Sequence, residues 1–186
     1  MEIEGRRLNL LIDQFMELAD MEAGGDLRTE ETYPVAETIR QAVDDARTVC
    51  RDRAGLDVVL EMQDGLPELN ILPEHLKRVL GHLLGNACNF TNDGNITVRV
   101  SSSDGKAVEL VVADTGKGVP PVELESIFKP FHQVETGDTL VDEVKGAGLG
   151  LALCRMVVEK LGGRVWARSE AGQGAAFYVV LPGERD

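Results

Sequence analysis

The chain has 186 residues, of which 43% are hydrophobic and only 4% aromatic, and it carries a formal net charge of −13. This length and composition are typical of one well-buried domain with an appendage, and they argue against a disordered protein. The acidic balance opposes nucleic acid and anionic membranes as partners, so we expect no nucleic-acid function. Because no apolar run approaches the roughly 18 residues of a membrane span, and no signal peptide is evident, we expect a cytoplasmic protein. Whether a longer parent protein is membrane-anchored stays open.

The cysteines, Cys50, Cys88 and Cys154, are odd in number and far apart, and they lack C-x-x-C spacing. Such a pattern supports neither a disulfide framework nor a zinc site. We therefore predict reduced, mostly buried thiols.

Residues 6–23 carry hydrophobic side chains three and four positions apart, which predicts an amphipathic helix that Gly24 and Gly25 end. One terminal helix cannot bury such a stripe alone, so it should pack either on its own domain or on a second copy of itself, as a stalk does. Both arrangements remain open. The stripe consists of Leu8, Leu11, Ile12, Phe15, Leu18 and Ala19.

The remaining elements predict helices in the first half of the chain and hairpins in the second. This order favours an α/β fold, a two-layer sandwich with helices on one face of a mixed, largely antiparallel sheet. We expect an extended segment at 27–33, helices at 34–55, 73–90 and 149–161, and strands at 56–62, 95–102, 107–113, 164–169 and 175–181.

The helix at 73–90 has a polar face that includes His82, Asn86 and Asn89. Such a face is often merely solvated. However, Gly81 and Gly85 each cost about 1 kcal/mol relative to alanine in a helix interior, which suggests that a ligand approaches here. The carbonyl oxygen of Asn86 suits Mg²⁺, which takes hard oxygen ligands and keeps waters and substrate phosphates. His82 is either a hydrogen-bonding partner of phosphate or water, or simply an exposed side chain.

Asp114 ends an apolar strand and begins the segment DTGKG. Alone, this segment is most often a plain turn, because aspartate and glycine both favour turns. In a nucleotide pocket the carboxylate would instead accept a hydrogen bond from the adenine amino group. Gly116 and Gly118 would then let the ring lie against the backbone.

The segment GAGLG at 146–150 lacks the preceding strand of a dinucleotide fingerprint, and the chain contains no P-loop motif. We instead expect Gly146, Gly148 and Gly150 to free backbone N–H groups at the start of the next helix, whose dipole favours phosphate. Lys145 would add a positive charge. A glycine-rich helix start without a ligand is the alternative. The polar, unpatterned residues before it predict a mobile loop.

Phe128 and Phe131 flank Lys129 and Pro130 just before that loop. Paired aromatics there are most often local core, which would anchor the first end of the loop. His132 and Gln133 follow and are further candidates for nucleotide contact.

Together these motifs resemble the catalytic ATP-binding domain of bacterial sensor histidine kinases, in the superfamily that also contains gyrase, chaperones and MutL. HLLGNACNFT resembles the N box, DTGKG the first glycine box, FKPF the F box and GAGLGLAL the second glycine box. The order and spacing agree across roughly residues 28–182. The segment RLNLLIDQFMELADMEAG is similar to the end of the second helix of the preceding dimerisation domain. We therefore assign residues 1–25 to that helix and residues 26–186 to the catalytic domain.

The resemblance implies a Bergerat-type sandwich that binds Mg·ATP under a lid at about residues 132–147. It implies transfer of the γ-phosphoryl group to a histidine on the dimerisation domain, and from there to the receiver domain of a response regulator. The full-length protein would be a homodimer. The implied metal ligand is Asn86, and the implied nucleotide-binding residues are His82, Asn86, Asn89, Asp114, Gly116, Gly118, Phe131, Lys145, Gly146, Gly148, Leu149 and Gly150.

Several positions depart from the family pattern. Asparagine is usual where His82 stands, a basic residue where Asn89 stands, and threonine or serine where Ala175 stands. No histidine of this chain has the context of a phosphoacceptor with its acidic neighbour, so we assign no catalytic residue and expect no autophosphorylation by these residues alone. Two alternatives remain: a degenerate nucleotide-binding or interaction module, and an anti-sigma-factor-type serine kinase.

Overall fold

The computed structural model describes residues 12, 14–16, 19, 24, 27–51, 53, 55–134 and 148–183. The strands are β1 (Arg28–Tyr33), β2 (Leu56–Met62), β3 (Leu69–Ile71), β4 (Gly94–Ser101), β5 (Ala107–Asp114), β6 (Arg164–Ser169) and β7 (Ala175–Pro182). The helices are α2 (Val35–Cys50), α3 (Pro73–Phe90) and α4 (Gly150–Lys160), with short 3₁₀ helices η1 (Pro121–Glu123) and η2 (Ser126–Phe128). None of the described helices has the length and hydropathy that a membrane crossing requires.

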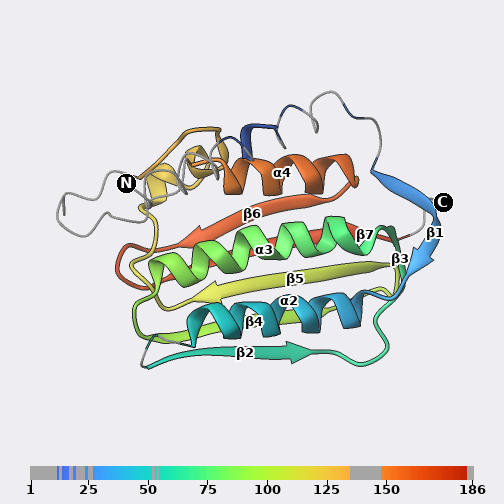
Figure 1. Ribbon diagram of the computed structural model, residues 1–186, viewed down its shortest axis with the longest axis horizontal. Coiled ribbons are helices and arrows are strands. Elements are labelled where there is room, and N and C mark those ends of the chain that lie inside the picture. The colour runs from blue at the N-terminus through green and yellow to red at the C-terminus, as the bar shows by residue number, and fades with distance from the viewer. Residues whose placement is uncertain are drawn as a thin grey trace.

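The main sheet has five strands in the order β2-β4-β5-β7-β6. The β2–β4 pair is parallel, and the other pairs are antiparallel. Helices α2, α3 and α4 lie across one face of this sheet (Figure 1). The predicted two-layer α/β sandwich is therefore confirmed. The division of the chain at residue 25 stays a prediction.

Alternation of side chains along the strands explains the two layers. In β5 every second residue is buried, and in β7 the same pattern runs from Ala175 to Leu181. The buried strand residues meet hydrophobic residues of the helices spaced three and four apart, such as Val79, Leu80 and Leu83 of α3. Each fully buried aliphatic or aromatic side chain contributes about 1.5–3 kcal/mol. This shared core fixes α3 against the sheet.

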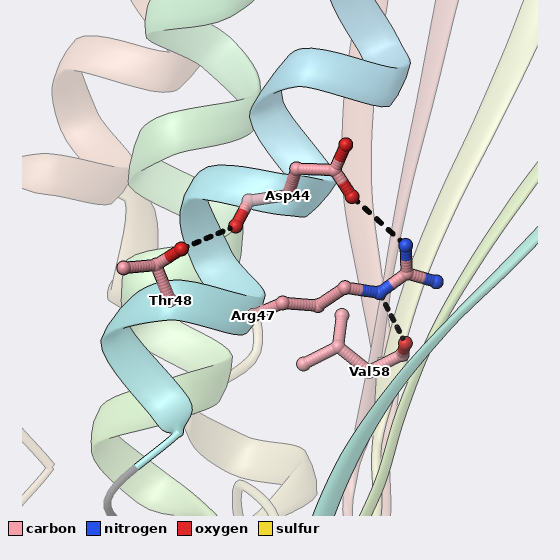
Figure 2. Close-up of polar contacts among 4 residues, drawn as sticks. All are labelled: Asp44, Arg47, Thr48 and Val58. Carbon is pink, nitrogen blue, oxygen red and sulfur yellow. Dashed lines mark hydrogen bonds and ion pairs between the residues drawn. The ribbon is translucent and has the colours of Figure 1, made fainter.

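Helix α2 is also tied to the edge strand β2 by polar contacts (Figure 2). The guanidinium of Arg47 donates a hydrogen bond from Nε to the Val58 carbonyl, at 3.0 Å, and contacts Asp44 through Nη1, at 2.9 Å. The Thr48 hydroxyl donates to the Asp44 carbonyl one turn earlier, at 3.0 Å. Arg47 thus joins the helix layer to a backbone carbonyl of the sheet.

Two small features differ from the sequence prediction. Strand β3 pairs with β1 in a separate two-stranded sheet, and a strand of three residues is too short to show alternation. Helix α2 ends at Cys50 instead of at the predicted Gly55. Gly55 has a φ of +88° and begins the turn into β2, so the chain has already left the helix there.

Cys50 and Cys88 form a disulfide that joins the end of α2 to the last turns of α3, with their Cα atoms 6.3 Å apart. The prediction of reduced thiols is wrong for this pair, because packing of α2 on α3 brings together residues that are 38 positions apart. Cys154 is free and buried, as expected. Burial raises the pKa of its thiol to about 12, so it is chemically inert at neutral pH.

Candidate functional site

A cavity of about 300 Å³ lies between α3, the end of β5 and the start of α4. Its size is at the lower end of the range of small-molecule sites, roughly 300–1,000 Å³. Residues from distant parts of the sequence meet there. Of the predicted nucleotide-binding residues, the cavity brings together His82, Asn86, Asn89, Asp114, Gly118, Gly148 and Gly150.

Helix α3 presents His82, Asn86 and Asn89 to the cavity one after another along one face. Gly81 and Gly85 directly precede His82 and Asn86 in the sequence and also line the cavity. A Cβ atom at either glycine would meet nothing within 4 Å. Packing therefore does not require glycine at these positions, and the open space belongs to the cavity.

Gly85→Ala should consequently separate stability from ligand binding. Alanine is favoured over glycine by about 1 kcal/mol in a helix interior, so the free energy of unfolding of the free protein should rise by about that amount. A methyl group that projects into an occupied site should instead weaken ATP binding about tenfold. Urea unfolding and ATP titration of the same variant measure both effects. A variant that binds ATP as well as the unsubstituted chain would show that the space above Gly85 is unused.

Asp114 closes one wall of the cavity at the end of β5, where its backbone pairs with Ile96 of β4. The residue is 9% exposed, and the Gly116 N–H donates a hydrogen bond to Oδ1 at 2.8 Å. Burial raises the pKa of this carboxyl, while the N–H groups of Gly116 and Ala175 oppose the shift. The turn thus holds a partly desolvated acceptor in a fixed orientation.

Gly116 and Gly118 let the turn after Asp114 pack closely on neighbouring backbone. A Cβ at Gly116 would stand 2.3 Å from the Phe90 carbonyl oxygen, and one at Gly118 would stand 2.2 Å from that of Glu170. The glycines are therefore required by backbone packing on α3 and on the β6–β7 turn. Gly118 also lines the cavity, whereas Gly116 supports Asp114 from outside it.

A hydrogen bond connects the residues on either side of the predicted lid. The Phe131 N–H donates to the Gly148 carbonyl at 3.0 Å, and the His132 ring contacts the Glu123 carboxylate at 2.7 Å. His132, Gln133 and Gly148 line the cavity. Lys145 and Gly146 lie outside the described residues, so their predicted roles stay predictions.

The two phenylalanines of FKPF have different environments. Phe128 is 5% exposed and packs edge-on against Phe177, with ring centroids 6.3 Å apart. Phe131 has a φ of +61° and is 63% exposed, and its ring does not line the cavity. The prediction of a local core is confirmed for Phe128, which is buried, and wrong for Phe131, which is exposed.

The start of α4 meets α3 at His82. A Cβ at Gly150, the first residue of α4, would stand 3.4 Å from Nδ1 of His82. The His82 ring therefore lies beside the first turn of α4, and both His82 and Gly150 line the cavity. The N-terminus of a helix favours phosphate, so this is a suitable place for it. Leu149 is 1% exposed and packs with Leu153 as an anchor of the helix start, outside the cavity lining.

Some lining residues were not predicted. Val119, Ile127 and Phe177 form an apolar part of the wall, and their sequence pattern is the same as that of ordinary core. Lys117 lies 4.6 Å from the ring centroid of Phe90, and both line the cavity. Gln14, far upstream in the sequence, lines it too.

Within the described ranges there is no cluster of three or more histidine, cysteine, aspartate or glutamate side chains that would hold a metal ion alone. The donor set fits Mg²⁺ all the same, because this ion uses few protein oxygens and completes its shell with water and phosphate. Asn86, which lines the cavity, carries such an oxygen in its side chain.

Comparisons with known proteins agree with this geometry. Residues 71–185 match the family described as "Histidine kinase-, DNA gyrase B-, and HSP90-like ATPase". The chain is 32% identical over 180 residues to the alginate biosynthesis sensor protein KinB of Pseudomonas aeruginosa, covering 96% of this chain and 29% of KinB. It is 30% identical over 183 residues to the sensor protein SrrB of Staphylococcus aureus, with 96% and 30% coverage. The chain thus spans less than a third of these two relatives.

Two solved structures have a similar fold. Full-length ShkA in complex with AMPPNP aligns with a TM-score of 0.82 and 27% identity, covering 98% of this chain and 37% of ShkA. The mycobacterial sensor histidine kinase MprB aligns with a TM-score of 0.69 and 27% identity, with coverage of 84% and 99%.

Proposed function

Because the chain belongs to the histidine kinase-, DNA gyrase B- and HSP90-like ATPase family, we propose that it binds Mg·ATP in this cavity as the catalytic domain of a sensor histidine kinase. In that role it transfers the γ-phosphoryl group to a histidine on a dimerisation domain. The observation that carries the proposal is the meeting of three distant motifs on one cavity: the polar face of α3, Asp114 and the glycine-rich start of α4.

Each motif has a separate task towards the nucleotide. Asp114 accepts a hydrogen bond from the adenine amino group, which fits its fixed and partly desolvated carboxyl. The N–H groups at the start of α4 and the side chains of His82 and Asn89 bind phosphate oxygens. Asn86 would hold Mg²⁺, which neutralises phosphate charge during transfer. The apolar wall at Val119, Ile127 and Phe177 excludes water from the ring.

The phosphoryl acceptor and the partners come from outside the described cavity. The sensor proteins among the relatives support an acceptor histidine on a dimerisation domain, a homodimer of the full-length protein, and a response regulator receiver domain as the next acceptor. The exposed side chains of Ile12 and Phe15, at 51% and 54%, support the dimer because they leave the predicted stripe available to a second copy. We also propose a cytoplasmic location, and the net charge of −13 opposes nucleic acid as a partner.

Titration with ATP in the presence and absence of Mg²⁺ tests the proposed site. The unsubstituted chain should gain affinity from Mg²⁺, and Asn86→Ala should lose most of that gain while its Mg²⁺-free affinity stays unchanged. Calorimetry of both proteins gives the four dissociation constants, with the exposed Asn95→Ala as the matched control. If Asn86→Ala keeps the full Mg²⁺ effect, Asn86 is not the metal ligand.

The same titration distinguishes the proposed kinase from a second candidate, a degenerate nucleotide-binding or interaction module. The observation that favours this candidate is His82, which stands beside Gly150 in the place where the family usually has asparagine. A degenerate site would bind ATP equally with and without Mg²⁺. His82→Asn would then restore the dependence on the metal.

A further inference from the structure

Lys117 lies in the turn that follows Asp114 and lines the same cavity. Among the lining residues that the structure describes, it is the only lysine or arginine. The lining also contains the carboxyl group of Asp114, and the chain as a whole has a net charge of −13. Lys117 thus places the one permanent positive charge on the described part of the cavity wall.

The backbone of Lys117 is held between α3 and the β6–β7 turn. Its N–H donates to the Phe90 carbonyl at 3.4 Å, and its carbonyl accepts a hydrogen bond from the Gly172 N–H at 2.7 Å. The residues on either side are Gly116 and Gly118, where a Cβ would stand 2.3 and 2.2 Å from a backbone oxygen of a neighbouring element. This close packing on two elements fixes the point from which the lysine side chain extends.

The side chain of Lys117 lies over the aromatic ring of Phe90, with Nζ 4.6 Å from the ring centroid. An ammonium is attracted to the negative face of such a ring. Phe90 also lines the cavity and directly follows Asn89, whose side chain we propose to bind phosphate oxygens. Lys117 is an exposed residue, so a ligand that enters from solvent can approach it.

We infer that Lys117 is a nucleotide-binding residue whose positive charge attracts the phosphates of ATP. This rests on the proposed ATP-binding function. ATP brings several negative charges to an acidic protein, and the cavity face of α3 contributes no lysine or arginine. Because low-dielectric walls focus the field of a charge inside a cleft, a single ammonium on the wall acts on the ligand more strongly than it would at an open surface.

The alternative role of Lys117 is to cover the ring of Phe90 with its aliphatic stem, as lysine side chains often do on apolar surfaces. The two roles differ in what they require of the side chain. Covering the ring requires the stem, whereas attraction of phosphate requires the charge. Glutamine keeps part of the stem without the charge, and arginine keeps the charge and also stacks on aromatic rings.

The test compares Lys117→Gln and Lys117→Arg with the unsubstituted chain, using ATP and adenosine, which has no phosphate. Lys117→Gln should weaken ATP binding about tenfold and leave adenosine binding unchanged, whereas Lys117→Arg should bind ATP nearly as well as the unsubstituted chain. Calorimetry gives the dissociation constants of ATP, and displacement of ATP gives those of adenosine. The control is Lys106→Gln, which removes the same charge at the opposite end of β5 and should not change ATP binding.

Salt dependence gives a second readout, which needs no adenosine binding. Because ions screen the attraction between charges, the difference in ATP affinity between the unsubstituted chain and Lys117→Gln should shrink as NaCl is raised from about 0.05 to 0.5 M. A difference that stays the same at both concentrations would contradict a role for the charge.

Three further outcomes overturn the inference: unchanged ATP affinity in Lys117→Gln, an equal loss for ATP and adenosine, or a loss in Lys117→Arg as large as that in Lys117→Gln. The last two would assign Lys117 to packing on Phe90. If the unsubstituted chain binds no ATP, the proposed function fails. If it binds ATP and the Lys117 variants bind it equally well, this inference alone fails.

Discussion

Asp114→Asn should weaken ATP binding by roughly ten- to a hundredfold, because a charge-assisted hydrogen bond to the adenine amino group contributes about 1.5–3 kcal/mol. Asparagine keeps the shape of the side chain, so the loss reports the charge. Calorimetric titration measures it, with the exposed Asp57→Asn of β2 as the control. Unchanged affinity in Asp114→Asn would remove this residue from the adenine role.

The same substitution should not reduce the stability of the free protein. Burial raises the pKa of Asp114 in the folded state above its usual value. The folded protein therefore binds a proton more readily than the unfolded chain, and stability falls as the pH rises from the unfolded pKa through the folded one. The asparagine side chain of the variant has no charge to desolvate, so the unfolding free energy of Asp114→Asn should lose this part of the pH dependence. A large loss of stability at neutral pH would show that Asp114 is mainly structural.

Reduction of the Cys50–Cys88 disulfide should lower the free energy of unfolding by about 2–4 kcal/mol, the usual contribution of such a cross-link. The bond joins residues 38 positions apart, in α2 and α3, and so restricts the unfolded chain. Urea unfolding with and without reductant measures the difference. A Cys50→Ala/Cys88→Ala variant should be insensitive to reductant, and Cys154→Ala should respond as the unsubstituted chain does.

Equal stability in both redox conditions would contradict a stabilising cross-link. Disulfides are rare in reducing compartments, and we propose a cytoplasmic location for this protein. A count of free thiols in protein purified without reductant therefore belongs to the same experiment. The count is made after unfolding in denaturant, because Cys50, Cys88 and Cys154 are all buried in the folded protein. Three reactive thiols would show that the pair is reduced, and one would show the disulfide.

The secondary structure was predictable where the hydrophobic pattern is long and regular. Helix α3 was expected with the bounds that the structure shows, because Pro73 marks its first residue and its apolar face repeats every three to four residues. The β4–β5 hairpin followed from alternating residues on both sides of a turn. Strand β3 and the Cys50–Cys88 bond were missed, since they depend on tertiary pairing that no local pattern records.

The candidate site was predictable at its motifs and less so between them. Asn86, Asp114 and Gly150 belong to short polar or glycine-rich segments whose chemistry is readable from sequence, and the structure brings them to one cavity. Phe131 was misassigned because a φ of +61° cannot be inferred from a motif. Gln14 was overlooked since the apolar stripe around it dominated the pattern. Only the exposure of Ile12 and Phe15 shows which side of those residues faces the domain.

Glycine has two distinct uses around the cavity. At Gly116 and Gly118 a side chain would collide with the backbone of neighbouring elements. At Gly81 and Gly85 a side chain would collide with nothing in the protein itself. The first pair shapes the turn that orients Asp114, and the second pair leaves space on α3 for a ligand. Substitutions at the two pairs should therefore have opposite effects on the stability of the free protein.

Phosphoryl transfer to a histidine in trans tests the central proposal most directly. The chain is incubated with γ-labelled ATP and Mg²⁺ together with a separately supplied dimerisation domain that carries its histidine, and label on that histidine is followed with time. We predict acid-labile label that requires the chain and that Asp114→Asn strongly reduces. Normal ATP binding without any label on the histidine would contradict the kinase function and leave a nucleotide-binding module.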